Sequence, residues 1–130
     1  MPEQLLTFAA GESIVIKATR IDTGSLSTII FSATTTNKYA CLSNYLSFSQ
    51  SFGTNGYECE IFGVRVPLGC SEGSANAGGF VNLGFMSSGS NALTIKFNDK
   101  TYTGSITKSG NNFTINWPYS TGVIISPTSL

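Results

Sequence analysis

The chain has 130 residues, enough for one domain with a hydrophobic core and too few for two domains of ordinary size. Charged residues make up only 11% of it, against about 25% in an average soluble domain, and the formal net charge is zero. Since the Lys and Arg residues form no cluster, the sequence argues against binding of nucleic acid and against attraction to an anionic membrane.

Targeting signals are missing from the N-terminal part of the sequence. The first residues read MPEQLLTFAAGESIVI, without the basic stretch and long apolar run of a signal peptide. Apolar runs elsewhere are short and interrupted by polar residues, so we expect no membrane insertion. These features predict either a protein made and assembled in a cytosol or a mature domain carrying an added Met1.

Alternation of apolar and polar residues with a period of two runs through the chain, and no segment has a convincing helical period. Three consecutive apolar residues, Ile29, Ile30 and Phe31, indicate a strand that is covered on both faces. A polar stretch over residues 34–38 leads to a short apolar segment over 39–42, and another short apolar segment covers residues 4–8. The strands expected in the first third of the chain are those over residues 13–20 and 27–32.

The middle of the chain predicts one hairpin and then a long loop. Gly53-Thr54-Asn55-Gly56 is the expected hairpin turn, because Asn-Gly accepts the positive φ angles of primed turns. The apolar parity changes at Phe62-Gly63, which indicates a β-bulge. The segment 68–79 is rich in small residues and is expected to be a surface loop. The strands expected here are those over residues 46–52, 57–66 and 80–86.

The last third predicts an antiparallel meander of three strands joined by short polar turns. Phe97, Phe113 and Trp117 fall on its apolar parity and are expected to anchor the core. Pro118 ends the meander. The strands expected here are those over residues 93–97, 101–107 and 113–117, followed by a short strand over 123–126.

Eight or nine strands at spacings of about 8 to 12 residues are the pattern of a β-sandwich or small barrel. We expect an all-β protein: a single antiparallel β-sandwich domain over residues 1–130, jelly-roll or Ig-like. The terminal segments 1–9 and 119–130 are apolar and can extend from the domain or exchange with neighbouring copies.

No catalytic motif withstands inspection. The string Gly69-Cys70-Ser71-Glu72-Gly73 matches the G-x-S-x-G pattern, but the chain contains no histidine, so a Ser–His–Asp relay lacks its base. The absence of histidine and the scattered carboxylates also predict no metal site and no cofactor. We therefore expect no enzymatic activity and assign no catalytic residue.

Two carboxylates, Glu58 and Glu60, fall on the same face of one predicted strand. A glycosidase needs two carboxylates that flank a bond from opposite directions, which neighbours on one strand do not. The favoured interpretation is an exposed polar face, with Arg65 as an available ion-pair partner.

The sequence leaves the state of its three cysteines open. Cys41, Cys59 and Cys70 are too few for a disulfide scaffold, and their spacings do not fit a zinc site. One pair can form a disulfide and leave one thiol over. The favoured interpretation is three small buried hydrophobic residues.

The meander also carries a polar face, which has three competing explanations. It is a solvated outer surface, a surface that packs against another copy, or a surface that binds sugar hydroxyls. Its residues are Thr94, Lys96, Thr101, Thr103, Ser105, Thr107, Thr114 and Asn116.

These observations favour a non-enzymatic structural subunit of a virion, phage or extracellular fibre that works through self-association or attachment. Its expected partners are other copies of itself or other virion and fibre proteins. The alternative is a carbohydrate-binding, lectin-like module, with glycans as partners. The candidate contact residues are the aromatic platforms Tyr45, Tyr57 and Tyr119 and the polar residues Glu58, Glu60, Arg65 and Glu72.

Overall fold

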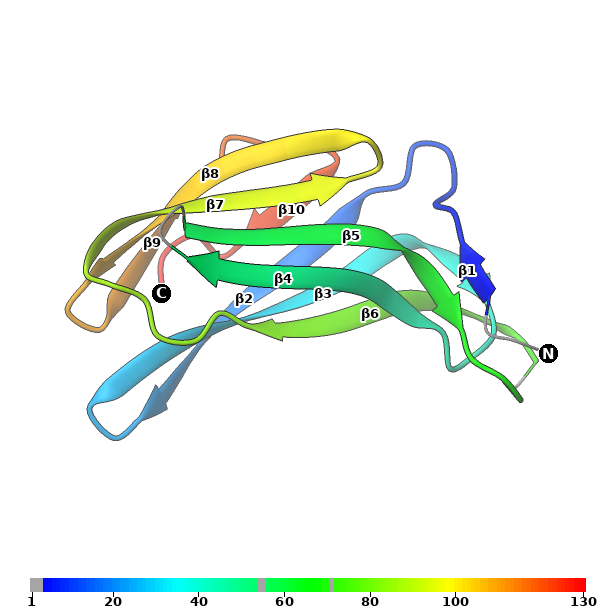
Figure 1. The fold of residues 1–130 in the computed structure, drawn as a ribbon, viewed down its shortest axis with the longest axis horizontal. Coiled ribbons are helices and arrows are strands. Elements are labelled where there is room, and N and C mark those ends of the chain that lie inside the picture. Colours follow the sequence, from blue (N-terminus) through cyan, green and yellow to red (C-terminus); the bar gives the residue numbers. More distant parts are fainter. Residues whose placement is uncertain (1–3, 54–55, 71) are drawn as a thin grey trace.

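The computed structural model describes residues 4–53, 56–70 and 72–130, and these residues form ten β-strands and no helix (Figure 1). The chain is therefore all-β, as predicted, and no described segment is a helix able to cross a membrane. The strands are β1 (Gln4–Leu6), β2 (Ile14–Thr23), β3 (Leu26–Ala40), β4 (Tyr45–Gly53), β5 (Gly56–Val66), β6 (Ser74–Asn82), β7 (Gly89–Phe97), β8 (Lys100–Ser109), β9 (Asn112–Asn116) and β10 (Val123–Ser126).

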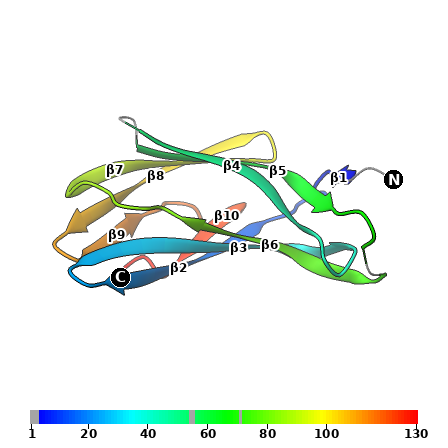
Figure 2. The same cartoon turned by 60° about the horizontal axis from the view of Figure 1, so that its bottom comes forward.

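The strands form two facing sheets with the hydrophobic core between them (Figure 2). Sheet A has six strands, and it curls over sheet B. β4 pairs with one edge of β5, while β7 and β1 pair with different parts of the other edge; β8 and β9 follow β7 in order. Sheet B has four strands in the order β10-β2-β3-β6. The arrangement is sandwich-like, because side chains of alternate parity from both sheets meet in one core.

Both sheets are mixed, so the prediction of a purely antiparallel sandwich is wrong. β7 pairs with β5 in parallel, and β10 pairs with β2 in parallel. The physical reason is that the chain changes sheet between the paired strands: it leaves β5, adds β6 to sheet B, and returns to sheet A in the original direction. Alternation along a strand does not specify its partner.

The predicted meander and its core residues are confirmed. β7, β8 and β9 pair antiparallel in sequence order, and Phe97, Phe113 and Trp117 are buried. Trp117 Nε1 donates a hydrogen bond of 2.8 Å to the carbonyl oxygen of Val123, which ties the meander to β10. A Cβ atom on Gly104 would lie 2.7 Å from the Trp117 ring, so the indole packs where a glycine makes room.

The predicted hairpin and bulge are also confirmed. β4 and β5 pair from Gly53 opposite Gly56 onward, while the turn residues Thr54 and Asn55 lie outside the described residues. The register shifts between Ser47 and Phe48, which lie opposite Gly63 and Ile61, so Phe62 is the extra residue of the bulge.

Two predicted boundaries are wrong. β3 runs unbroken from Leu26 to Ala40, through the polar stretch, and β6 begins at Ser74, inside the predicted loop. The two errors have one cause, because this part of β3 supplies hydrogen-bond partners to β6: Thr35 Oγ1 accepts from Ala77 N at 2.9 Å. β6 then ends at Asn82 and leaves Phe85 exposed instead of within the strand.

The cysteines do not form the predicted set of three buried thiols. Cys41 and Cys70 are joined by a disulfide with a Cα–Cα distance of 5.8 Å, which links the end of β3 to the β5–β6 connection. Cys59 is a buried free thiol on β5, and burial raises its pKa to about 11. A thiol with so high a pKa is protonated at neutral pH and unreactive.

Reducing this disulfide is expected to lower the free energy of unfolding by about 3 kcal/mol, since it closes a loop between residues 29 positions apart. Urea unfolding of the oxidised protein and of the C41S/C70S double variant measures the difference. Reductant should leave the double variant unchanged. Equal stability of the two proteins would contradict the prediction.

Both terminal segments pair with sheets of their own chain. Leu5 of β1 lies opposite Arg65 of β5, and β10 lies beside β2. Beyond β10, the C-terminal residues continue along β9, where Phe113 and Leu130 exchange two backbone hydrogen bonds of 2.9 Å. The C-terminal segment therefore joins one edge of sheet B to one edge of sheet A, and its exchange between copies stays a prediction.

Candidate functional site

The predicted polar site residues do not converge on one site. Glu58 and Glu60 share the outer face of β5, as expected, but the partner of Glu58 is Lys96 of β7, with 2.9 Å between Oε1 and Nζ. This hydrogen bond raises the pKa of Lys96. Arg65 lies beyond the bulge and reaches Ser47 Oγ at 3.4 Å, and Glu72 is exposed in the β5–β6 connection.

The three predicted aromatic platforms also differ from expectation. Tyr57 is only 3% exposed and therefore wrong as a platform; its hydroxyl donates to Gln50 Oε1 at 2.9 Å, and burial raises its pKa. Tyr119 is half-buried, and its hydroxyl accepts a hydrogen bond of 3.1 Å from Thr103 N. Tyr45 is exposed, at the start of β4. No row of coplanar exposed tyrosines results.

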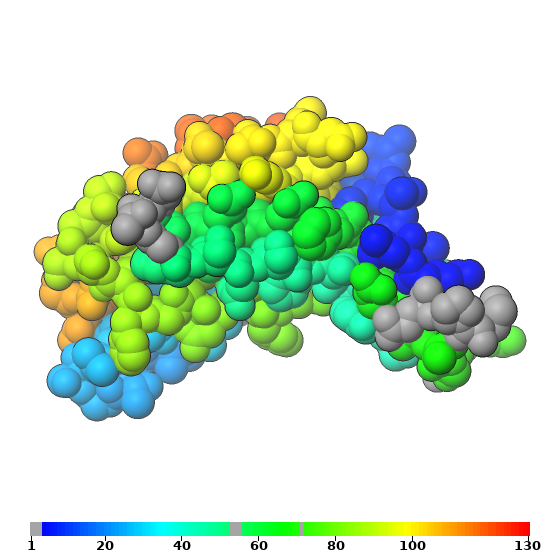
Figure 3. Space-filling view, in the orientation of Figure 1, coloured from blue at the N-terminus to red at the C-terminus, as the bar shows by residue number. Residues whose placement is uncertain are grey.

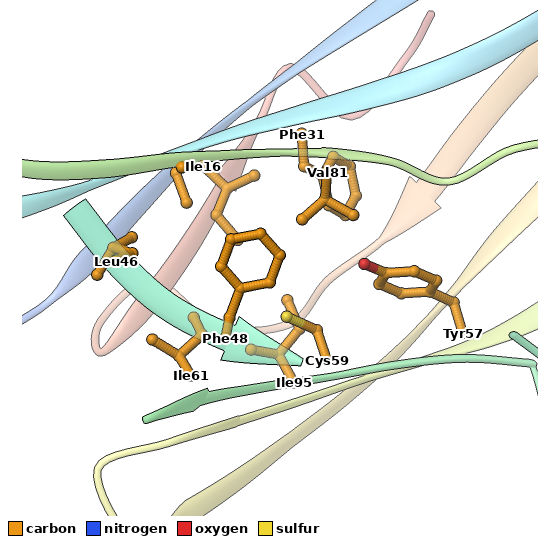
Figure 4. A pocket seen from close by; sticks show the side chains of 11 residues that line it. Ile16, Phe31, Leu46, Phe48, Tyr57, Cys59, Ile61, Val81 and Ile95 are labelled. Carbon is orange, nitrogen blue, oxygen red and sulfur yellow. The ribbon is translucent and has the colours of Figure 1, made fainter. Parts of the chain in front are cut away.

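An apolar pocket lies between the two sheets (Figure 4). Ile16, Phe31 and Val81 of sheet B point toward Phe48 and Tyr57 of sheet A across it. Its volume of about 20 Å³ is little more than one water molecule requires, and its walls are apolar. It is a packing gap in the core and too small to hold a ligand.

A buried carboxylate that sequence reasoning missed fastens the start of β2 to β3. Glu12 is 4% exposed, and its oxygens accept hydrogen bonds from Ser13 N (2.9 Å), Thr36 N (3.1 Å), Asn37 Nδ2 (3.0 Å) and Tyr39 OH (2.7 Å). Burial raises the pKa of Glu12, but these hydrogen bonds and one from Thr36 Oγ1 outweigh burial and hold the pKa below its ordinary value. The site is saturated by its own chain and is structural.

The polar face of the meander is the outer surface of sheet A, which faces the reader in Figure 3. Thr94 lies opposite Thr103, and Thr107 lies opposite Thr114, so hydroxyl groups form rows across the strands. Most of these side chains are exposed. This arrangement matches a solvated outer surface.

The outer surface of sheet B exposes more apolar side chains than the polar face of the meander, and we call it the sheet B face. Phe80 is 76% exposed near its edge, and Val15, Ile21 and Leu26 are also exposed. Its described charged residues are Lys17 and Lys38, and Lys38 lies opposite Asn76 beyond the register shift of β3. The side chains form these rows across the strands: Ile124, Val15, Thr34 and Gly78; Ser126, Lys17, Ser32 and Phe80; Thr19, Ile30 and Asn82; Ile21 and Thr28; Thr23 and Leu26; Lys38 and Asn76; Ala40 and Ser74.

A cleft of about 530 Å³ opens on sheet A, and we call it the β1–β7 cleft. Residues 7–8, 60–62 and 96–101 line it. It forms because β7 pairs with β5 as far as Ile61, whereas β1 pairs with the same edge of β5 from Val64 onward. In Figure 3 it separates the yellow β7–β8 turn from the blue N-terminal segment.

The β1–β7 cleft combines balanced charges with an exposed ring. Glu60 and Asp99 line it together with Lys96 and Lys100, so its formal charges cancel. Phe62, the extra residue of the bulge, also lines it and is 48% exposed. Of these residues, sequence reasoning selected only Glu60 as a contact; the bulge at Phe62 was the signal that could have located the cleft.

The described residues contain no group of three or more Cys, Asp or Glu side chains able to hold a metal ion. Comparisons of the chain with protein-family models, with curated proteins and with solved structures found no match.

Proposed function

We propose that the protein is a non-enzymatic structural subunit that associates with copies of itself through the sheet B face. The observation that carries this proposal is the exposure of Phe80, at 76%, on a surface that also exposes Val15, Ile21 and Leu26 and whose described charged residues are Lys17 and Lys38. Exposed apolar side chains grouped on one face mark interaction sites, because covering a Phe side chain is worth about 2 kcal/mol.

A second copy is the occupant that the chain's composition favours. The net charge is zero, so two copies do not repel each other at long range. A two-fold contact places the same face on both sides, and the apolar rows of β2 and β3 are then covered by equivalent rows. The run Ile29, Ile30 and Phe31 supports this: Ile29 and Phe31 face the core, and Ile30 faces outward and needs a cover.

The setting we propose is a virion, phage or extracellular fibre assembly, with other proteins of that assembly as further partners. The Cys41–Cys70 disulfide supports an oxidising location, because disulfides persist on virion surfaces and outside cells and are rare in the cytosol. A surface made largely of hydroxyl and amide groups is consistent with packing between subunits.

Within the sandwich class we propose a variant of the jelly-roll or Ig-like arrangement. Both are built from antiparallel sheets, and this chain departs from them at the parallel pairs β5–β7 and β10–β2.

Sedimentation velocity over a range of protein concentrations tests the proposed self-association. We expect a dimer or larger species that grows with concentration, and electron microscopy of that species should show a closed particle or a fibre. A monomer at the highest concentration reached, without a partner protein, would contradict the proposal.

A further inference from the structure

We propose that the β1–β7 cleft binds a neutral saccharide. This inference does not depend on self-association, because the cleft lies on sheet A and the proposed contact surface lies on sheet B. Copies joined through sheet B would each keep their cleft open to a ligand.

The charges of the cleft disfavour an anionic ligand. Glu60 and Asp99 line the cleft together with Lys96 and Lys100, and Lys96 is also held by Glu58, outside the lining, at 2.9 Å. Three carboxylates therefore face two ammonium groups, and an anionic ligand would meet no excess of positive charge. Carboxylates accept hydrogen bonds from hydroxyl groups, and ammonium groups donate to them, so the same set suits a polyol.

The apolar part of the cleft suits the C–H face of a sugar ring. Phe62 is held outward by the bulge of β5 and keeps about half of its ring exposed, while the buried Ile61 and Phe97 close the cleft behind it. Small-molecule sites have volumes of about 300–1,000 Å³ and combine an apolar wall with a few polar groups. The cleft, at about 530 Å³, has this size, and its lining is more polar than that of an average small-molecule site, which suits a ligand rich in hydroxyl groups.

The turn beside the cleft is not the one that stability alone would select. Asn98 and Asp99 have φ angles of 52° and 64°, the left-handed region that two-residue hairpin turns require. Glycine is the favoured residue at the second position of such a turn, and an aspartate there is held in a less stable conformation. Strained residues of this kind cluster at ligand sites, and here the strained side chain lines the cleft.

Titration of the ¹⁵N-labelled protein, followed by NMR, tests the site. The probes are methyl glycosides of glucose, galactose, mannose and N-acetylglucosamine, together with their β-linked disaccharides and a sialylated trisaccharide. We expect at least one neutral probe to shift the backbone amides of residues 60–62 and 96–101. Shifts with the sialylated probe alone would overturn the inference of a neutral ligand.

Three variants then locate the binding. Phe62→Ala is expected to weaken the binding of the neutral probe about tenfold, since the ring no longer contacts the sugar. Asp99→Gly is expected to weaken it by a similar factor and to raise the melting temperature, because glycine adopts the turn conformation without strain. Phe85→Ala, which removes an exposed ring outside the cleft, should change neither quantity.

Asp99→Gly is expected to weaken binding while raising the melting temperature. Misfolding would lower the melting temperature, so it cannot be the cause of weaker binding in this variant. Absence of amide shifts with every probe would overturn the proposal. Binding that Phe62→Ala and Asp99→Gly leave unchanged would place the ligand elsewhere and overturn it as well.

Discussion

Replacing Phe80 with serine is expected to weaken self-association about 100-fold. In a two-fold contact the substitution acts on both copies, and the loss of one buried ring costs about 1.5 kcal/mol on each side. Since Phe80 is exposed in the single chain, the free energy of unfolding should change by less than about 0.5 kcal/mol. Sedimentation equilibrium measures the dissociation constant, and urea unfolding measures the stability.

Leu68→Ser is the matched control for this prediction. Leu68 is 59% exposed, follows the end of β5, and lies outside the rows of the sheet B face. Its replacement removes a similar apolar surface and should leave the dissociation constant unchanged. If Phe80→Ser associates as tightly as the unmodified protein, the sheet B face is not the contact surface.

Replacing Glu12 with alanine is expected to lower the free energy of unfolding by about 4 kcal/mol. The substitution leaves the buried hydroxyl of Tyr39 without its acceptor, which costs about 1–3 kcal/mol, and it also removes hydrogen bonds from Ser13 N and Asn37 Nδ2 to a charged group. Chemical unfolding at neutral pH measures the effect. Glu72→Gln, at an exposed position, should change stability by less than about 0.5 kcal/mol.

The same carboxylate predicts how stability depends on pH. The folded protein holds the pKa of Glu12 below its ordinary value of 4.5, so folding stabilises the ionised form. The contribution is fully present above the unfolded pKa and is lost as the pH falls through the folded pKa. Glu12→Gln carries no titrating group there, so its stability should change less in this acidic range. A parallel loss of stability in both proteins would contradict this assignment.

Local pattern was sufficient to predict most of the strands and most of the apolar core of this protein. Successive side chains in a strand point to opposite faces, so alternation identified the meander and placed Phe97, Phe113 and Trp117 inside. The bulge at Phe62 was predicted for the same reason, because an extra residue reverses the parity. These features depend only on neighbours in the chain.

The strand segments 34–38 and 74–79 were missed because their own residues are polar or small. Their strands form only where each supplies hydrogen-bond partners to the other, as Thr35 does for Ala77. The buried Glu12 was missed for a similar reason: a lone carboxylate becomes a core residue only when Thr36, Asn37 and Tyr39 surround it.

The candidate sites depend on tertiary structure to a greater extent. Alternation predicts that the side chains of Ile30 and Phe80 face away from the core. Only the pairing of β2, β3 and β6 places them on one surface with Val15 and Ile21. In the cleft, Phe62 and Asp99 converge because two strands approach one edge of β5 from opposite ends.

By itself, the sequence determined most of the segments that are strands and the side of each that faces the core, because these properties follow from the two-residue period of an extended backbone. Only the tertiary structure decided which strands are neighbours, and with them the parallel pairs, the Cys41–Cys70 disulfide, the sheet B face and the β1–β7 cleft. Backbone hydrogen bonds between strands are alike for nearly every residue, so the choice of partner is made by the packing of the whole core.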